Sequence, residues 1–205
     1  KNMKYQKLGK TDLNASVVAF GAWGIGGGIV WPDMSLGVKD VERLLDAATE
    51  LGINYIDTAP VYGTGVSEDL LGKALKGGRR EKFLLQTKCS LNWRGDGGNN
   101  HYERDGVTVN NDTSARAVKQ DVEDSLKRMG TDYIDLIVVH YVCKDWPVEE
   151  TMGALQELIK EGKIRAVGLS NSQPGDLEEY SKYGTVALVQ ECFSLLSPYH
   201  GGDYF

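Results

Sequence analysis

Long apolar runs are missing from this sequence: none reaches the roughly 18 residues that a membrane-spanning helix needs, and no charged-then-apolar leader stands at its start. Its three cysteines are scattered, with no Cys-x-x-Cys pair, which is untypical of a disulfide scaffold and fits a reducing compartment. A formal net charge of −6 argues against nucleic acid or an anionic membrane as the main partner. We therefore expect a cytoplasmic protein with neither a membrane nor a nucleic-acid partner.

A Gly-x-Gly-x-x-Gly motif that follows the first strand and opens a helix is also missing, which argues against a Rossmann domain. What is present is an alternation of strands with helices of about 10–15 residues, and this order is typical of right-handed βαβ units in a parallel sheet. Strands are expected at 17–23, 54–59, 83–88, 133–140, 164–170 and 187–193, and helices at 38–51, from 67, and at 113–129, 148–160 and 174–183. The pattern alone is compatible with both an open doubly wound sheet and an eight-fold barrel.

Three further segments complete the expected layout. Residues 4–20 carry a Gly-Lys-Thr-Asp turn at 9–12 and predict a short N-terminal β-hairpin. Gly24 to Gly28 is too rich in glycine for a helix or a strand, and a flexible loop and a ligand-contacting loop fit it equally well. Residues 89–112 are expected to form a long polar loop, and loops of that length are usually functional or disordered. We expect this loop and the Gly24–Gly28 loop to shape the pocket.

Polar residues collect at the expected strand ends, and in a parallel barrel those ends form one ring around one mouth. They are Asp57, Lys88, His140, Ser170, Asn171 and Gln190. A carboxylate such as Asp57 is costly to bury unless it is paired, so we expect it to face Lys88. An ammonium group beside a phenol stabilises the phenolate, which would let Tyr62 serve as a general acid while His140 donates to or orients the same oxygen.

Each residue of this set also has a plain structural interpretation. Lys88 alone fits a solvated strand end, His140 alone a hydrogen-bonded structural histidine, Asp57 a turn cap, and Tyr62 a packing residue. Their joint occurrence at successive strand ends favours a proton-transfer site.

Several stretches of the chain resemble the aldo-keto reductase family, in detail its bacterial sugar- and inositol-type branch. They are Tyr5-Gln-Lys-Leu-Gly-Lys-Thr, Asp57-Thr-Ala-Pro-Val-Tyr-Gly with Ser67-Glu68, Thr87-Lys88, residues 124–136 (Asp-Ser-Leu-Lys-Arg-Met-Gly-Thr-Asp-Tyr-Ile-Asp-Leu), residues 162–171 (Gly-Lys-Ile-Arg-Ala-Val-Gly-Leu-Ser-Asn) and Gln190. The resemblance implies a (β/α)8 TIM barrel that binds NADP(H) across its mouth, with NAD(H) not excluded.

The resemblance also implies roles for individual residues. Asp57, Tyr62, Lys88 and His140 match the catalytic tetrad, in which Tyr62 protonates the carbonyl oxygen of a sugar or small aldehyde or ketone. The residues that match the nicotinamide carboxamide site are Ser170, Asn171 and Gln190, with Asp57 beside them. Trp23 matches an aromatic wall of the substrate pocket that also includes Tyr62 and His140, although an ordinary core tryptophan is the alternative for Trp23.

The chain departs from the family in its length. A (β/α)8 barrel usually takes about 250 residues, whereas the pattern supplies about six of the eight β/α units. We expect a single, C-terminally incomplete barrel domain over residues 1–205, interrupted at Gly201–Phe205 and lacking the tyrosine that stacks on the nicotinamide and the basic loop that grips the adenosine 2′-phosphate. A remnant with two exposed sheet edges would be prone to aggregation.

Competing hypotheses follow from these observations. The first is an NADP(H)-dependent carbonyl reductase or alcohol dehydrogenase; the second is a barrel that binds cofactor or regulates a partner without turnover, and the third is a scaffolding domain. Cys89, Cys143 and Cys192 follow strand ends, but their spacing has no ligand signature and strand alternation turns Cys89 away from Lys88, so we expect no metal.

Overall fold

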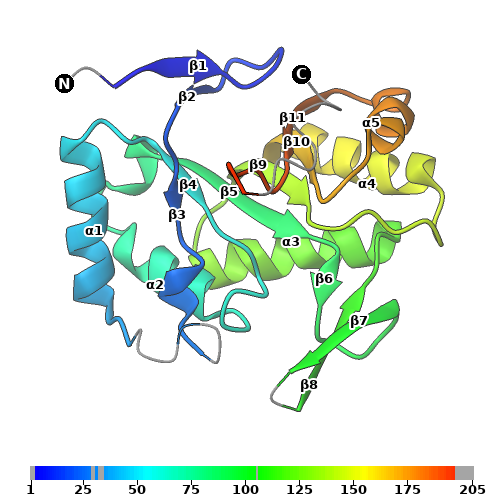
Figure 1. Ribbon diagram of the computed structural model, residues 1–205, viewed down its shortest axis with the longest axis horizontal. Helices are drawn as coiled ribbons and strands as arrows, with labels where there is room; N and C mark the ends of the chain where they lie inside the picture. The colour runs from blue at the N-terminus through cyan, green and yellow to red at the C-terminus, as the bar shows by residue number, and fades with distance from the viewer. Residues whose placement is uncertain (1–2, 29–30, 32–34, 105, 197–205) are drawn as a thin grey trace.

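The computed structural model describes residues 3–28, 31, 35–104 and 106–196, and its centre is a six-stranded parallel sheet with the strand order β11-β10-β9-β5-β4-β3. The strands of this sheet are β3 (Phe20–Gly21), β4 (Tyr55–Asp57), β5 (Leu84–Cys89), β9 (Ile134–Val139), β10 (Ile164–Ser170) and β11 (Val186–Gln190). The α-helices are α1 (Val38–Glu50), α2 (Val66–Ala74), α3 (Ala115–Met129), α4 (Val148–Lys160) and α5 (Pro174–Ser181). Figure 1 shows the sheet curving with the helices along its outer side, which makes a partial (β/α) barrel.

Two apolar layers hold this arrangement together. The larger one lies between the outer face of the sheet and the helices, where Ile56, Leu85 and Ile137 meet Leu45 and Leu155. The smaller layer fills the concave side with Leu13, Leu136, Val138, Ala166 and Ala187. Because successive side chains of a strand point to opposite faces, the central strands β9 and β10 supply both layers.

The N-terminal hairpin closes one end of the concave side. Strands β1 (Tyr5–Lys7) and β2 (Asn14–Ser16) pair antiparallel, as the sequence predicted. Leu13 and Leu8 pack into the inner layer, and Gly9 approaches the chain so closely that a side chain there would meet the Ala187 carbonyl oxygen at 2.6 Å. Since the hairpin packs near the beginnings of β9, β10 and β11, the carboxyl ends of the strands are left to form the site.

The βαβ alternation is confirmed, and the helix boundaries fall close to the predicted ones. Helix α3 illustrates why: the Ser114 side chain accepts a hydrogen bond from the Ala117 backbone N–H at 3.3 Å, and Gly130 ends the helix with a φ of 60°. No helix in the described part of the chain has the length and the apolar character that a membrane crossing requires.

The largest correction concerns residues 89–112, which were expected to be a loop. They contain a three-stranded antiparallel sheet of β6 (Leu91–Asn92), β7 (Asn99–Arg104) and β8 (Val107–Asn111). All but one residue of β7 are exposed, so the alternation of apolar and polar residues by which a strand is predicted is absent there. The order comes from backbone pairing on β8, whose Val109 is buried.

Smaller corrections concern the strand ends and one loop. The first core strand covers only Phe20–Gly21 of the expected 17–23, and Val17 and Val18 are exposed. The last strand ends at Gln190 rather than 193, because the Glu191 side chain turns to accept hydrogen bonds from Ser172. Gly24–Gly26 forms one 3-10 turn, η1, and a second such turn, η2, covers Arg80–Lys82. The interruption predicted at 201–205 lies outside the described residues.

Candidate active site

The predicted strand-end residues meet at one cavity of about 480 Å³ at the carboxyl ends of the parallel strands. Seven of the eight predicted site residues line it: Trp23, Tyr62, Lys88, His140, Ser170, Asn171 and Gln190. The eighth, Asp57, lies directly behind Lys88 and is bonded to it. Parallel strands that end at one edge therefore bring together residues as far apart in sequence as 23 and 190.

Lys88 is the centre of the site. It is only 2% exposed, and its ammonium group bonds Asp57 Oδ1 at 2.7 Å, the Thr58 carbonyl oxygen at 2.9 Å and the Tyr62 hydroxyl at 3.1 Å. These three acceptors match the three N–H donors of a lysine ammonium. The buried charge is thus fully hydrogen-bonded, and it lies against the phenol.

Tight turns hold Tyr62 over this ammonium. The residues that follow it, Gly63, Thr64 and Gly65, all have positive φ. A side chain on Gly63 would meet the Gly26 carbonyl oxygen at 2.0 Å, so the Tyr62 turn packs directly on the η1 turn. This contact ties the glycine-rich loop to the site, and Gly26, Gly27 and Gly28 of that loop line a second cavity of about 300 Å³.

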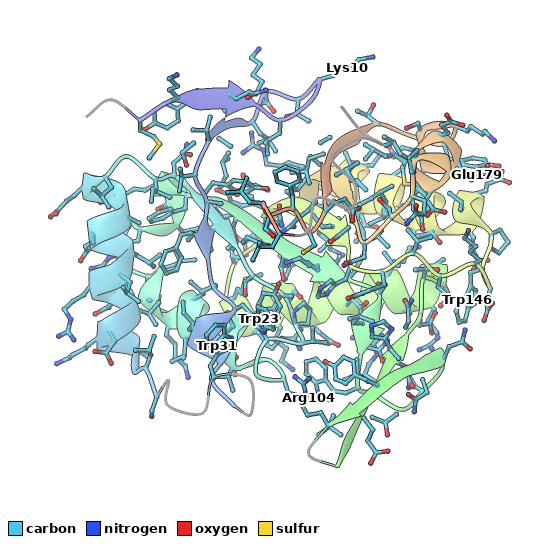
Figure 2. All side chains as sticks on the ribbon, in the orientation of Figure 1. Lys10, Trp23, Trp31, Arg104, Trp146 and Glu179 are labelled. Atoms are coloured by element: carbon cyan, nitrogen blue, oxygen red, sulfur yellow. The ribbon has the colours of Figure 1, made fainter. Side chains whose placement is uncertain are left out.

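Aromatic rings surround the Tyr62 phenol. Trp23 stacks on it with ring centroids 5.9 Å apart and an interplanar angle of 30°, and His140 approaches edge-on at 6.2 Å. Trp23 is 50% exposed, so the alternative of an ordinary core tryptophan is wrong. Figure 2 shows Trp23 with Trp31 close by, and the two rings meet edge to face at 5.8 Å.

His140 is held as a neutral imidazole. Burial, and after it the positive charge of Lys88, keeps the pKa of His140 well below its usual value. Its Nδ1 atom is buried and has no hydrogen-bond partner in the part of the chain that the structure describes. A neutral imidazole offers one N–H donor to a substrate oxygen without adding a second charge beside Lys88.

Ser170, Asn171 and Gln190 present hydroxyl and amide groups at the ends of β10 and β11. Asn171 has a φ of 49°, and its side-chain N–H₂ donates to the His140 carbonyl oxygen at 2.9 Å and to Ser170 Oγ at 3.1 Å. The Gln190 amide donates to Asp57 Oδ2 at 2.8 Å. All three residues line the cavity, and Gln190 is also hydrogen-bonded to Asp57 and Gln86.

Sequence reasoning missed Gln86, which connects this set. Its side-chain N–H₂ donates to Asp57 Oδ1 at 2.6 Å and to Gln190 Oε1 at 2.7 Å, and its own oxygen accepts from the Tyr55 hydroxyl. Burial, and then the nearby Asp57 charge, raises the pKa of Tyr55, so the phenol stays a donor. Strand alternation was a usable signal, since Gln86 lies two residues before Lys88 and so on the same face.

Sequence reasoning also missed the individual residues that form the outer wall of the cavity. His101, Tyr102 and Arg104 of β7 line it, together with Tyr141, which follows β9. The His101 and Tyr141 rings lie 4.4 Å apart, so β7 lies against the residues around His140. The sequence predicted that residues 89–112 shape the pocket, but an exposed polar stretch gave no sign of which of its side chains face the site.

Comparisons with known proteins show what the chain is similar to. A family model described as the aldo/keto reductase family matches residues 17–201. The NADH-specific methylglyoxal reductase of Escherichia coli is 38% identical over 200 residues, which cover 95% of this chain and 60% of that protein.

Solved structures give the same result. A glycerol dehydrogenase from Gluconobacter oxydans superposes with a TM-score of 0.80 at 32% identity over 98% of this chain and 57% of that one. The holo form of an aldo-keto reductase from Bacillus halodurans gives 0.77 at 36% identity over 94% of this chain and 58% of that one. The chain thus spans about three fifths of the length of these relatives.

Proposed function

The chain belongs to the aldo/keto reductase family, and on that premise we propose that the protein interconverts the carbonyl of a sugar or small aldehyde or ketone with the alcohol, with Tyr62 as the general acid. The observation that carries the proposal is the Lys88 ammonium, which bonds both Asp57 and the Tyr62 hydroxyl. An ammonium held this way stabilises the phenolate that remains once Tyr62 has given its proton away.

Each residue then has one task. Asp57 offsets the charge of Lys88 and holds it in place, and Lys88 stabilises the developing phenolate at Tyr62. His140, kept neutral by burial, donates a hydrogen bond to the same substrate oxygen and orients it toward the phenol. Trp23, stacked on Tyr62, covers the reacting end of the substrate.

The residues of the β10 and β11 ends suit a nicotinamide cofactor. Its carboxamide presents one carbonyl acceptor and one N–H₂ donor, and hydroxyl and amide side chains can pair with both. We propose that Ser170, Asn171 and Gln190 hold this carboxamide and so choose which face of the ring points at the substrate. When bound, the cofactor supplies or accepts the hydride.

The choice between NADP(H) and NAD(H) is part of the proposal. The family resemblance favours NADP(H), while the Escherichia coli relative is described as NADH-specific. We propose NADP(H) as the first cofactor to test, with NADH in parallel. We further propose that the chain contributes about six units of a single (β/α)8 barrel domain of a cytoplasmic enzyme.

A direct test measures the oxidation of NADPH and of NADH by the full-length protein with methylglyoxal, glyceraldehyde and an aldose. We expect turnover with at least one of them, and we expect Tyr62→Phe to abolish it while cofactor affinity stays nearly intact. Tyr183→Phe is the matched control, because Tyr183 is a partly exposed tyrosine away from the cavity. Tyr62→Phe turnover equal to the wild type would contradict the assigned role.

Cofactor binding without any turnover would instead support the non-catalytic alternative, a barrel that binds the nucleotide for regulation. No nucleotide binding at all would leave only a scaffolding role.

A further inference from the structure

Arg104 differs from every other arginine of the chain. The other seven arginines each form an ion pair with a carboxylate, and Arg104 forms none with any described residue. The contact that it does make is with the Tyr102 ring, whose centroid lies 5.4 Å from the guanidinium carbon. A guanidinium carries a fork of N–H donors that matches carboxylate and phosphate groups, so an unpaired one at a cavity is available to a ligand.

Arg104 lies at the candidate active site. It ends β7 and lines the main cavity together with Tyr62, Lys88 and His140. It also lines the adjoining cavity of about 300 Å³, and Trp23 is a wall of both. Figure 2 labels both residues in the lower central part of the view, with Arg104 at the end of β7 and Trp23 at the start of the η1 turn.

Among the described residues, the other charges of the cavity leave Arg104 as its one cation without an ion pair. The charge of Lys88 is offset by Asp57 at 2.7 Å. Glu191 also lines the cavity, but it lies after β11 and already accepts hydrogen bonds from Ser172. An anionic group in the cavity is therefore attracted to the side of the β7–β8 hairpin and repelled from the side of β11.

A continuous aromatic wall joins Arg104 to the reacting phenol. From Tyr102 the ring centroids follow one another at 5.7 Å to His101, 4.4 Å to Tyr141, 5.4 Å to His140 and 6.2 Å to Tyr62. A ligand lying along this wall would have one end at Tyr62 and the other near Arg104.

We propose that the substrate carries an anionic group, a carboxylate or a phosphate, and that Arg104 binds this group while the carbonyl lies at Tyr62. The inference rests on the proposed function, because it names the class of substrate for that same site. Arg104 acts as a specificity-determining residue and takes no part in the proton transfer.

The anion is assigned to the substrate rather than to the cofactor because of where the two sets of residues lie. The residues proposed for the carboxamide are at the ends of β10 and β11, at one edge of the sheet. The β7–β8 hairpin instead follows β5 along the chain, and β9 lies between β5 and β10 in the sheet. A cofactor anchored at β10 and β11 therefore leaves the hairpin side for substrate.

The test compares para-carboxybenzaldehyde with its uncharged methyl ester in the full-length protein. We expect the wild type to prefer the acid. In Arg104→Gln, kcat/KM for the acid should fall about 10- to 100-fold, since a charge-assisted pair is lost, while the value for the ester stays unchanged. Arg104→Lys should retain part of the preference because it keeps the charge without the fork.

Arg43→Gln is the matched control, because Arg43 lies on the exposed face of α1 and pairs there with Asp40, away from the cavity. A second pair, glyceraldehyde phosphate and glyceraldehyde, distinguishes a phosphate from a carboxylate as the preferred group. The affinity of Arg104→Gln for NADPH and NADH should equal that of the wild type. A weaker cofactor affinity with an unchanged acid-to-ester ratio would assign the anion to the cofactor and overturn the proposal.

A binding measurement keeps the inference separate from the proposed function. If no aldehyde is turned over, the proposed function fails, and calorimetric titration with terephthalate still tests Arg104. Binding that weakens at least tenfold in Arg104→Gln supports the anion site. Equal binding by the two proteins, or none by the wild type, overturns it.

Discussion

The strand-end network and the β7–β8 hairpin face the same cavity, yet they are built in opposite ways. The strand-end network (Asp57, Gln86, Lys88 and Gln190) lies on buried or half-buried strands, and every one of its charges is paired. The hairpin (residues 99–104 and 106–111) is mostly exposed, and it carries Arg104, which has no ion pair with any residue that the structure describes. The strands of the parallel sheet form one side of the cavity, and a separate hairpin attached to that sheet forms the other side.

This difference has a chemical consequence. Proton transfer requires groups whose positions and charges are fixed before the substrate arrives, and a fully hydrogen-bonded network provides that. Recognition of the rest of the substrate needs donors that are still free. Variants on the two sides should therefore have different effects. Substitutions in the network should lower both stability and kcat, whereas substitutions in the hairpin should raise KM alone.

Lys88→Met should give the largest effect. Removing the ammonium leaves Asp57 as an unpaired carboxylate, and breaking a buried pair in this way costs about 3–5 kcal/mol of unfolding free energy. Turnover should fall about 10²- to 10⁴-fold, because Tyr62 loses the group that stabilises its phenolate. Urea denaturation and steady-state kinetics measure the two losses.

The control for this variant is Lys119→Met, which breaks an exposed pair with Glu157 and should cost about 0–1 kcal/mol. Adding Asp57→Asn to Lys88→Met should restore part of the stability and none of the turnover. A stability loss as small as that of the control would show that the network does not support the fold.

Gln86→Leu should come next. The substitution removes two donors and one acceptor, and leaves Gln190 Oε1 and the Tyr55 hydroxyl without their partner. Each buried polar group left unpaired costs about 1–3 kcal/mol, and kcat should fall about tenfold as Asp57 loosens. Gln120→Leu on the exposed side of α3 is the control. A changed KM at constant kcat would place Gln86 outside the network.

The same contrast explains what could be predicted from the sequence. Asp57, Lys88, His140, Ser170 and Gln190 were found because β-branched strands alternating with helices define strand ends, and parallel strands end at one edge. Gln86 was within reach of the same alternation and was passed over because it lies inside a strand rather than at its end.

That residues 99–104 and 106–111 pair as strands could not be predicted from the sequence, for a physical reason. The first strand of this hairpin has almost no buried residue, so its order depends on backbone pairing with β8 and not on a hydrophobic pattern. Glycine and asparagine dominate its surroundings, and those residues predict loops. Within the described ranges Arg104 has no ion pair while the seven other arginines each have one, and this difference is visible only from distances between side chains.

The pH dependence of stability is the third prediction. Because the pKa of His140 is lowered in the folded protein, protonation favours the unfolded chain, whose histidine has a pKa near its usual value of about 6.5. Stability is therefore complete above that pH and falls as the pH decreases below it, by at most about 1.4 kcal/mol per pH unit for this one group. His140→Gln should flatten the curve between pH 7 and pH 5 in urea titrations. An identical curve would mean that other groups carry the acid sensitivity.

Tyr102→Ala should have the smallest effect on the fold, and it tests the hairpin side directly. Tyr102 lines both cavities and lies beneath Arg104, so its loss removes a wall that the substrate contacts. KM for aromatic aldehydes should rise several-fold, while kcat stays constant and the unfolding free energy changes by less than about 1 kcal/mol. Urea denaturation of Tyr102→Ala and Gln86→Leu in parallel compares the unfolding free energy that each variant loses. If both lost the same stability, the hairpin would be as much a part of the folded core as the strand ends, and a division between a fixed side and an attached side of the cavity would not hold.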